Sequence, residues 1–208
     1  MPNNLPLFNL NEYITDSEAL IAGVDEVGRG CLFGQVVAGA VILPVKSINQ
    51  LTEIGVKDSK KLTAKKRADL VSQIQEIVFD WQVTEIDNKM IDQINIFQAS
   101  LLAMSQAINQ LKCTPILCLI DGKFSLPNLE YPQLNLVKGD LRSPVIASAS
   151  ILAKVWRDQK IVEYAEKFPE YDLANNKGYP TKKHLEAIKK YGVTPFHRLS
   201  FKPCNLVK

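Results

Sequence analysis

The sequence predicts a mixed α/β fold in which helices flank a β-sheet, and two observations lead to this prediction. Continuously apolar runs at 20–24, 36–43, 116–120 and 134–137 have the length of buried strands and end in polar turns. Longer segments repeat apolar residues at steps of three and four, which is the period of a helix. Early strands followed by alternating helices and strands are typical of a mixed sheet.

Polar residues mark where each predicted strand ends. The first run stops at Asp25 and Glu26, a glycine-rich turn follows, and the second run stops at Pro44. The third run ends in Asp121 with a glycine after it, and the fourth ends before Lys138. These positions predict a strand, turn and strand near the start of the chain, and two further strands that end in polar turns.

Thr63 is a suitable N-cap for the first predicted helix, and the stretch 79–86 overlaps the end of that helix and can form a strand instead. Its apolar positions are Val71, Ile74, Val78 and Trp81. Asp87 is a suitable N-cap for a second helix, which has the strongest periodicity in the chain. Its apolar positions are Ile94, Phe97, Leu101, Met104, Ile108 and Leu111.

Two helices are expected in the last third of the chain. A long helical pattern runs from about 143 to 168. A shorter one is capped by Thr181, is stopped by Gly192, and directs Leu185 and Ile188 inward.

Composition is that of an ordinary globular protein. The 208 residues are 46% hydrophobic and 23% charged, so we expect one domain spanning 1–208, without a disulfide or metal staple. The net charge of +3 would suit a polyanionic partner but does not establish one. No signal peptide or membrane-spanning stretch is recognisable, so we expect a cytoplasmic protein, monomeric and without membrane contact. The cysteines form no C-x-x-C pair and are typical of buried thiols in a reducing compartment: Cys31, Cys113, Cys118 and Cys204.

Three acidic residues stand at the ends of buried strands. Asp25 and Glu26 are consecutive, and two successive acids on an apolar strand are destabilising unless something positive lies between them. Asp121 precedes a glycine, and an Asp-Gly pair is also an ordinary turn. In open α/β sheets functional groups collect at strand ends, which favours a functional interpretation of these three residues together.

A fourth acid, Asp158, lies within the long helical pattern. Its spacing places it on one face with Val155 and Val162, so a charge would be directed toward the core. An ion pair with Lys154 or Arg157 explains this position equally well.

Together the four acids would form a site for a hard cation. All-oxygen ligation favours Mg²⁺ or Mn²⁺, and the absence of a His or Cys cluster disfavours zinc. Adjacent strand residues point to opposite faces, so Asp25 and Glu26 can share this site only if the strand twists or ends between them.

The Gly-Arg-Gly segment at 28–30 lacks the spacing of a P-loop or of a dinucleotide fingerprint, and by itself predicts a hairpin turn. Its amides, with no side chain in the way, could donate to a sugar hydroxyl or a phosphate beside the metal site.

Six blocks of sequence carry a family resemblance. They are GVDEVGRG at 23–30, KDSKKL at 57–62, IDG at 120–122, ASASILAKVWRD at 147–158, NKGYPTKKHLEAI at 176–188 and HRLSF at 197–201. In this order they make the chain resemble the ribonuclease HII family, the type 2 ribonucleases H, from Ile21 to Pro203. The long N-terminal domain of the related type 3 enzymes is missing from this sequence.

The resemblance implies a ribonuclease H-like α/β fold, a mixed β-sheet flanked by helices, with a small helical C-terminal part at roughly 169–208. It implies cleavage of RNA in RNA/DNA hybrids, and incision 5′ of single ribonucleotides embedded in duplex DNA. Two divalent ions, Mg²⁺ or Mn²⁺, about 4 Å apart would activate a water and stabilise the leaving 3′-oxygen. The products would carry 5′-phosphate and 3′-hydroxyl ends.

The resemblance also implies roles for individual residues. The family's catalytic, metal-binding acids fall on Asp25, Glu26, Asp121 and Asp158, the same four that the pattern marks. The Gly-Arg-Gly turn would contact the 2′-hydroxyl of the ribonucleotide, a tyrosine would pack against the adjacent sugar, and lysines would contact phosphates. The expected substrate-binding residues are Gly28, Arg29, Gly30, Lys60, Lys154 and Tyr179, with Lys61 and Lys138 as weaker candidates.

Two positions depart from the family pattern. Cys31 and Gln35 stand where the family often has proline, which predicts a less rigid turn. His184 and His197 lie in matched blocks, but we expect them to be packing residues rather than ligands.

Two alternatives stay open. A non-catalytic module that binds RNA/DNA hybrids would keep the fold, although the presence of all four acids weighs against it. Another nuclease on the same fold, such as a junction resolvase or transposase, would share the carboxylates but not the Gly-Arg-Gly turn and tyrosine.

Overall fold

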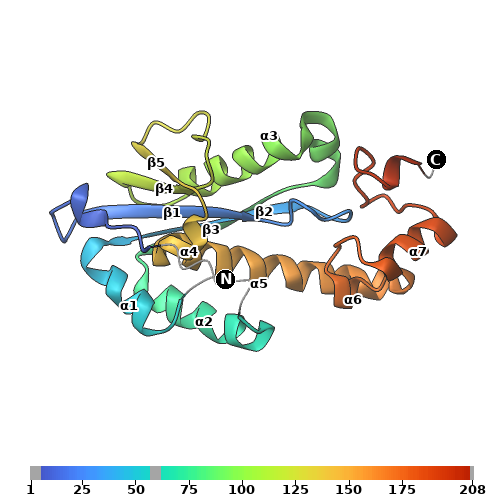
Figure 1. Ribbon diagram of the computed structural model, residues 1–208, viewed down its shortest axis with the longest axis horizontal. Coiled ribbons are helices and arrows are strands. Elements are labelled where there is room, and N and C mark those ends of the chain that lie inside the picture. The colour runs from blue at the N-terminus through green and yellow to red at the C-terminus, as the bar shows by residue number, and fades with distance from the viewer. Residues whose placement is uncertain (1–5, 57–61, 207–208) are drawn as a thin grey trace.

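A computed structural model describes residues 6–56 and 62–206. The described part of the chain forms a five-stranded sheet with the order β3-β2-β1-β4-β5 (Figure 1). The β1–β2 and β2–β3 pairs are antiparallel, whereas the β1–β4 and β4–β5 pairs are parallel, so the predicted mixed sheet is confirmed. The strands are β1 (Leu20–Val27), β2 (Val36–Pro44), β3 (Asp80–Ile86), β4 (Leu117–Asp121) and β5 (Gln133–Leu136).

Helices cover both faces of the sheet (Figure 1). One face packs against α3, and the other packs against α5, with α1 and α2 outside it. The last two helices, α6 and α7, lie at the far end of α5 beside the C-terminal segment. The helices are α1 (Ile48–Glu53), α2 (Ala64–Ile77), α3 (Asn88–Asn109), α4 (Gly139–Arg142), α5 (Pro144–Lys167), α6 (Leu173–Asn176) and α7 (Lys182–Tyr191). Short 3-10 turns occupy Leu10–Glu12, Val45–Ser47, Pro169–Tyr171 and Cys204–Leu206.

Side-chain caps begin three of these helices where the sequence predicts them. Thr63 Oγ1 accepts a hydrogen bond from Lys66 N at 3.2 Å, and Asp87 Oδ1 accepts one from Met90 N at 2.8 Å. Thr181 Oγ1 accepts from the N–H of His184 at 3.4 Å. Because each cap satisfies a backbone donor that the first turn leaves unpaired, these residues fix where α2, α3 and α7 start.

For the stretch 79–86 the sequence left open the end of the first helix or a strand, and the structure shows the strand β3. The α2 helix ends at Ile77, and Val78 already has extended backbone angles. Phe79 N then donates to Ile42 O at 2.8 Å, and Trp81 pairs with Val41 within the sheet. Pairing with β2 therefore overrides the helical spacing.

The α3 helix contains a break that its periodic sequence does not reveal. Asn95 has φ 66° and ψ 163°, which few residues other than glycine adopt. Its side-chain oxygen accepts hydrogen bonds from Phe97 N at 3.0 Å and Gln98 N at 3.1 Å, and so caps the second half of the helix.

The first strand does not end at Asp25 and Glu26, as the sequence suggested, but runs through both to Val27. The reason is that β2 continues to pair with it, placing Asp25 opposite Gly39 and Glu26 opposite Ala38. Both acids therefore sit on a paired strand rather than in a turn.

Two smaller expectations concern the cysteines and membranes. Cys31, Cys118 and Cys204 are buried free thiols as predicted, whereas Cys113 is only half-buried. Within the residues that the structure describes, no helix is long and apolar enough to cross a membrane.

Candidate active site

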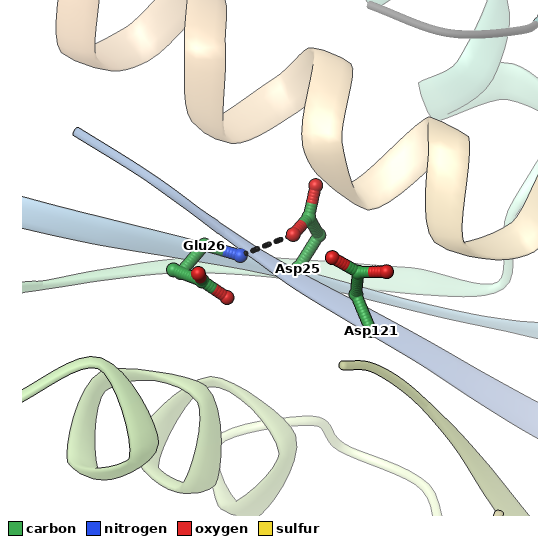
Figure 2. Close-up of side chains that lie close together, drawn as sticks. All are labelled: Asp25, Glu26 and Asp121. Atoms are coloured by element: carbon green, nitrogen blue, oxygen red, sulfur yellow. Dashed lines mark hydrogen bonds between the residues drawn. The ribbon is translucent and has the colours of Figure 1, made fainter. Parts of the chain in front are cut away.

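Three acids meet at the carboxyl ends of two neighbouring parallel strands. The β1–β4 ladder ends at the pair Val24 and Ile120, so Asp25 and Asp121 come next on their strands. Oxygen atoms of Asp25, Glu26 and Asp121 all lie within 4.8 Å of one another (Figure 2). We call these three residues the acid cluster.

The two consecutive acids share the cluster although they lie on one continuous strand. Asp25 points toward α5 and Glu26 toward α3, with Asp121 beside them (Figure 2). The neighbouring strand β4 ends at Asp121, whereas β1 continues to Val27. Beyond Asp121, β4 therefore no longer lies between the side chains on the two faces of β1. The Glu26 N–H also donates to Asp25 Oδ1 at 2.7 Å. Asp25 and Glu26 can therefore approach each other because β4 ends beside them, and not because β1 ends between them.

Burial and mutual repulsion shape the titration of the cluster. Burial raises the pKa of Asp25 well above its ordinary value, and the nearby charges of Glu26, Asp121 and Asp140 raise it further. A hydrogen bond with the Ser150 side chain acts in the opposite direction and lowers this pKa. Burial also raises the pKa of Glu26, and the guanidinium of Arg29, 3.1 Å from Glu26 Oε1, opposes that rise. Three hard oxygen donors that repel one another are suited to a divalent cation such as Mg²⁺ or Mn²⁺.

Sequence reasoning missed a fourth acid close to the cluster, Asp140 of α4. Asp140 is buried, and its charge is near enough to raise the pKa of Asp25. The N–H of Gly139 donates to Asp121 Oδ1 at 2.6 Å, which ties the start of α4 to the cluster. The signal was present in the sequence, because Asp140 follows a buried strand just as Asp121 does.

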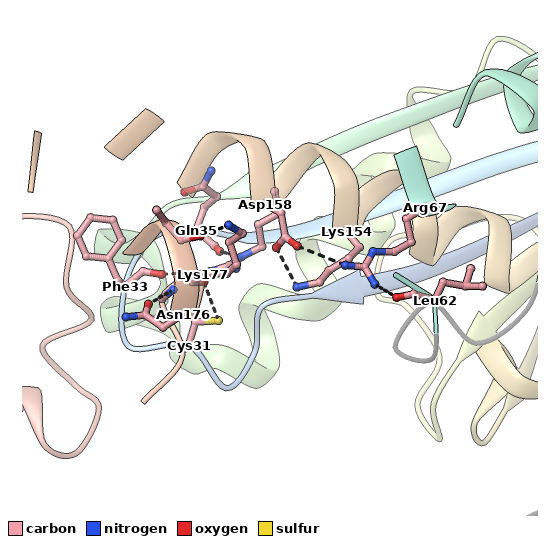
Figure 3. Close-up of polar contacts among 12 residues, drawn as sticks. Cys31, Phe33, Gln35, Leu62, Arg67, Lys154, Asp158, Asn176 and Lys177 are labelled. Atoms are coloured by element: carbon pink, nitrogen blue, oxygen red, sulfur yellow. Dashed lines mark hydrogen bonds and ion pairs between the residues drawn. The ribbon is translucent and has the colours of Figure 1, made fainter. Parts of the chain in front are cut away.

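Asp158 lies outside the acid cluster. Its carboxylate contacts Lys154 Nζ at 2.8 Å and Arg67 Nη2 at 3.9 Å (Figure 3). The expectation that its helix face points into the core is wrong, because Val155 is only half-buried and Val162 is 40% exposed. The alternative interpretation, an ion pair with Lys154, is the arrangement observed.

The Gly-Arg-Gly turn and the tyrosine lie together, as the resemblance implied. A Cβ at Gly30 would lie 3.9 Å from Cε1 of Tyr179, so the ring packs beside this glycine. Tyr179 keeps 38% of its surface exposed, and Gly30 is exposed too. Gly28 has φ +92°, and a Cβ there would lie 2.2 Å from Nε of Arg157, so only glycine fits.

The predicted lysine contacts differ in their surroundings. Lys154 Nζ lies 5.5 Å from the centroid of the Tyr179 ring as well as against Asp158, so it borders the turn. Lys138 is exposed at the start of α4. Lys60 and Lys61 lie outside the described residues.

His184 and His197 are fully buried and bonded to each other, with their Nε2 atoms 3.1 Å apart. His184 Nδ1 lies 2.9 Å from the carbonyl of Tyr179, which can only accept, so His184 donates there and its Nε2 accepts from His197. His197 Nδ1 then accepts from Thr194 N at 2.9 Å. This chain of hydrogen bonds requires both imidazoles to be neutral, and it holds the backbone of Tyr179.

Comparison with solved structures defines the class of the fold. The ribonuclease H2 of Pyrococcus horikoshii OT3 superimposes with a TM-score of 0.77 at 30% identity, over 90% of this chain and 96% of that one. The sheet, its flanking helices and the acids at its strand ends thus define a ribonuclease H-like protein.

Sequence comparison then gives the family. The model of the ribonuclease HII family matches residues 22–204. Ribonuclease HII of Trichormus variabilis is 52% identical over 187 residues, which cover 90% of this chain and 83% of the relative. Ribonuclease HII of Acaryochloris marina is 53% identical over 190 residues, or 91% of this chain and 96% of the relative. The chain belongs to the ribonuclease HII family and is an endonuclease of the ribonuclease H type.

Proposed function

We propose that this protein hydrolyses the RNA strand of RNA/DNA hybrids and incises duplex DNA 5′ of single ribonucleotides, leaving 5′-phosphate and 3′-hydroxyl ends. The observation that carries the proposal is the juxtaposition of the acid cluster with the Gly-Arg-Gly turn. Arg29 of the turn contacts Glu26 of the cluster at 3.1 Å, so a ribose held at the turn lies next to the carboxylates.

The metal-binding residues of the proposed site are Asp25, Glu26 and Asp121, with Asp140 as the acid nearest to them by its electrostatic effect. Two divalent cations, when bound, would supply an activated water and stabilise the leaving 3′-oxygen. Mg²⁺ and Mn²⁺ accept the same oxygen ligands. Asp158 is not one of the proposed metal ligands, because its carboxylate is engaged by Lys154 and Arg67.

Recognition of the ribonucleotide is assigned to the turn and the tyrosine. Backbone amides of Gly28, Arg29 and Gly30 would meet the 2′-hydroxyl, the group that distinguishes RNA from DNA, and the Tyr179 ring would pack on the adjacent sugar. Lys154 would border the phosphates, with Asp158 fixing its ammonium group. Lys60 is a further candidate on the strength of its sequence block alone.

The proposal is tested by cleavage of three labelled substrates: a DNA duplex with one ribonucleotide, an all-DNA duplex and an RNA/DNA hybrid. Each is incubated with Mg²⁺, Mn²⁺ or EDTA. We expect metal-dependent cleavage 5′ of the ribonucleotide and within the hybrid, and an intact all-DNA duplex. Binding of the hybrid without cleavage would favour a non-catalytic module instead, and cleavage of all-DNA duplex would favour another nuclease on this fold.

A further inference from the structure

Two fully buried arginines pack against the turn at 28–35. They are Arg157 of α5 and Arg198 in the segment that follows α7, and each is 0% exposed. In the part of the chain that the structure describes, neither forms an ion pair with a carboxylate. A buried cation that forms no direct ion pair is a weak source of stability, so its placement calls for another explanation.

Arg157 connects the turn to the segment that carries Tyr179. Its Nε donates to Gln35 O at 3.1 Å and its Nη2 to Phe33 O at 3.1 Å, both within the turn. Its Nη1 donates to Lys177 O at 2.9 Å, two residues before Tyr179. The same guanidinium fills the space next to Gly28, where a Cβ would lie 2.2 Å from Nε. One rigid, planar group thus sets two backbone segments, the 28–35 turn and the segment before Tyr179, relative to one another.

Arg198 fixes the middle of the Gly-Arg-Gly segment. Its Nη1 donates to Arg29 O at 2.9 Å and its Nε to Gly34 O at 2.9 Å. Its own N–H donates to Leu32 O at 2.8 Å, so side chain and backbone hold the same turn. Its Nη2 is a buried donor for which the structure gives no acceptor.

The bond to Arg29 has a directional consequence. In a trans peptide the carbonyl and the following N–H point in opposite directions. Because the Arg29 carbonyl is turned inward to Arg198, the N–H of Gly30 is turned outward, on the exposed side of the turn beside the Tyr179 ring. Among the described residues this N–H has no acceptor.

We propose that Arg157 and Arg198 are positioning residues for ribonucleotide recognition, which hold the 28–35 turn against Tyr179 so that the Gly30 N–H is presented to the 2′-hydroxyl. Neither guanidinium forms a direct ion pair among the described residues, although the charge of Asp92 acts on Arg198, and two positive charges here also favour the approach of a phosphodiester. Burial lowers the pKa of Arg198 to about 10, so this charge is retained at neutral pH.

Because this role rests on the proposed function, the test separates the two. Single-turnover cleavage, with enzyme in excess, is measured on a DNA duplex that carries one 2′-hydroxyl nucleotide and on the same duplex with a 2′-fluoro nucleotide. Carbon-bound fluorine is a much poorer hydrogen-bond acceptor than a hydroxyl oxygen, so the fluoro nucleotide offers the Gly30 N–H no adequate acceptor. The ratio of the two rates does not depend on the folded fraction of the enzyme, so a merely less stable variant keeps it.

We compare Arg198→Lys and Arg157→Lys, which keep the charge but lose the planar fork, with Ile74→Val, a core change on α2 remote from the turn. The ratio is expected to fall at least tenfold in both lysine variants and to stay at the wild-type value in Ile74→Val. Calorimetric Mn²⁺ binding is expected to be unchanged in all three, since the acid cluster is untouched. The two lysine variants are made separately, so that the rate ratio of one tests the proposal if the other does not fold.

A wild-type ratio in the lysine variants would overturn the positioning role while leaving the proposed function in place. Loss of Mn²⁺ binding in these variants would also overturn it, because the damage would then reach the acid cluster. Failure of the wild-type protein to distinguish the two nucleotides would overturn the proposed function and this role together.

Discussion

The acid cluster and the 28–35 turn are neighbours built in opposite ways. In the cluster, carboxylates face one another, and their burial, followed by their mutual repulsion, raises the pKa values of Asp25 and Glu26. In the turn, buried guanidinium groups donate to backbone carbonyls, and a neutral histidine pair holds Tyr179. A bound cation would relieve the cluster, whereas the turn is held by bonds within the chain. The comparison suggests that the reaction depends on side-chain charge and recognition on the shape of the backbone.

The largest effect is expected from Asp121→Asn, which removes one charge from the cluster. Its Oδ1 can still accept from the Gly139 N–H, so the fold should be kept. Loss of a residue that only hydrogen-bonds to a metal ligand typically lowers metal affinity or activity about 10–100-fold. Loss of a charged ligand itself should therefore lower kcat/KM at least about 100-fold.

The measurement is cleavage of the single-ribonucleotide duplex, with circular dichroism as a check on folding. The matched control is Asp69→Asn, an exposed acid on α2, which should retain full activity. Full activity of Asp121→Asn would refute its metal role.

The next effect concerns the histidine pair on the turn side. Burial and the neighbouring His184 lower the pKa of His197 to about 3, from an ordinary 6.5. The unfolded chain therefore binds the proton more tightly, and stability falls as pH decreases below 6.5. Between pH 6.5 and 5 this single group should remove about 2 kcal/mol of the free energy of unfolding.

Urea unfolding of wild type and His197→Gln at several pH values measures this dependence. The variant should be less stable at pH 7 but should lose less stability on acidification. Parallel pH profiles for the two proteins would show that His197 is not held neutral by the fold.

The acid cluster predicts a pH effect of the opposite sign. A carboxyl whose pKa is raised in the folded state destabilises the metal-free protein as pH rises from its ordinary pKa through the raised one. Asp25→Asn removes that charge and should raise the Tm of the metal-free protein at pH 7 by roughly 2–4 °C, the shift expected for about 1 kcal/mol at this chain length. The same variant should lose the increase in Tm that Mg²⁺ or Mn²⁺ gives the wild type. Differential scanning calorimetry with EDTA or metal tests both, and a lower metal-free Tm would contradict the prediction.

The smallest effect is expected from Asp158→Asn, which separates the two regions most directly. The change weakens contacts with Lys154 and Arg67 but leaves the acid cluster intact. Calorimetric Mn²⁺ affinity should stay within about twofold of wild type, and kcat/KM should fall less than about tenfold, through KM, because one ion pair contributes about 1 kcal/mol or less. A large loss of Mn²⁺ affinity would return Asp158 to the metal site.

Much of the fold could be predicted because the relevant signals are local. The caps Thr63, Asp87 and Thr181 satisfy donors within one turn, and the strand-end acids follow from sheet topology. The sequence left Trp81 between a helix and a strand because the residue that decides, its pairing partner Val41, lies 40 residues away on β2. The break at Asn95 was invisible because the apolar spacing continues through it.

Only part of the site could be predicted, because the rest depends on contacts between segments that are far apart in the sequence. Which face of α5 is buried depends on what packs against it, and spacing alone placed a charge in the core at Asp158, whereas the structure places one at Arg157. Arg157 had been considered only as a partner for that acid. Asp140 was passed over because a polar turn explained it sufficiently, although Asp121 offered the same signal.

The bonds from Arg157 and Arg198 end on carbonyl oxygens, which every amino acid carries in the same form. Substitutions along the turn therefore leave its anchors in place, provided that the new side chain fits. Cys31 and Gln35 are accommodated in this way, with the Gln35 carbonyl bonded to Arg157. Apart from glycines such as Gly28, the turn thus depends for its shape less on its own side chains than on two residues more than a hundred positions further along the chain.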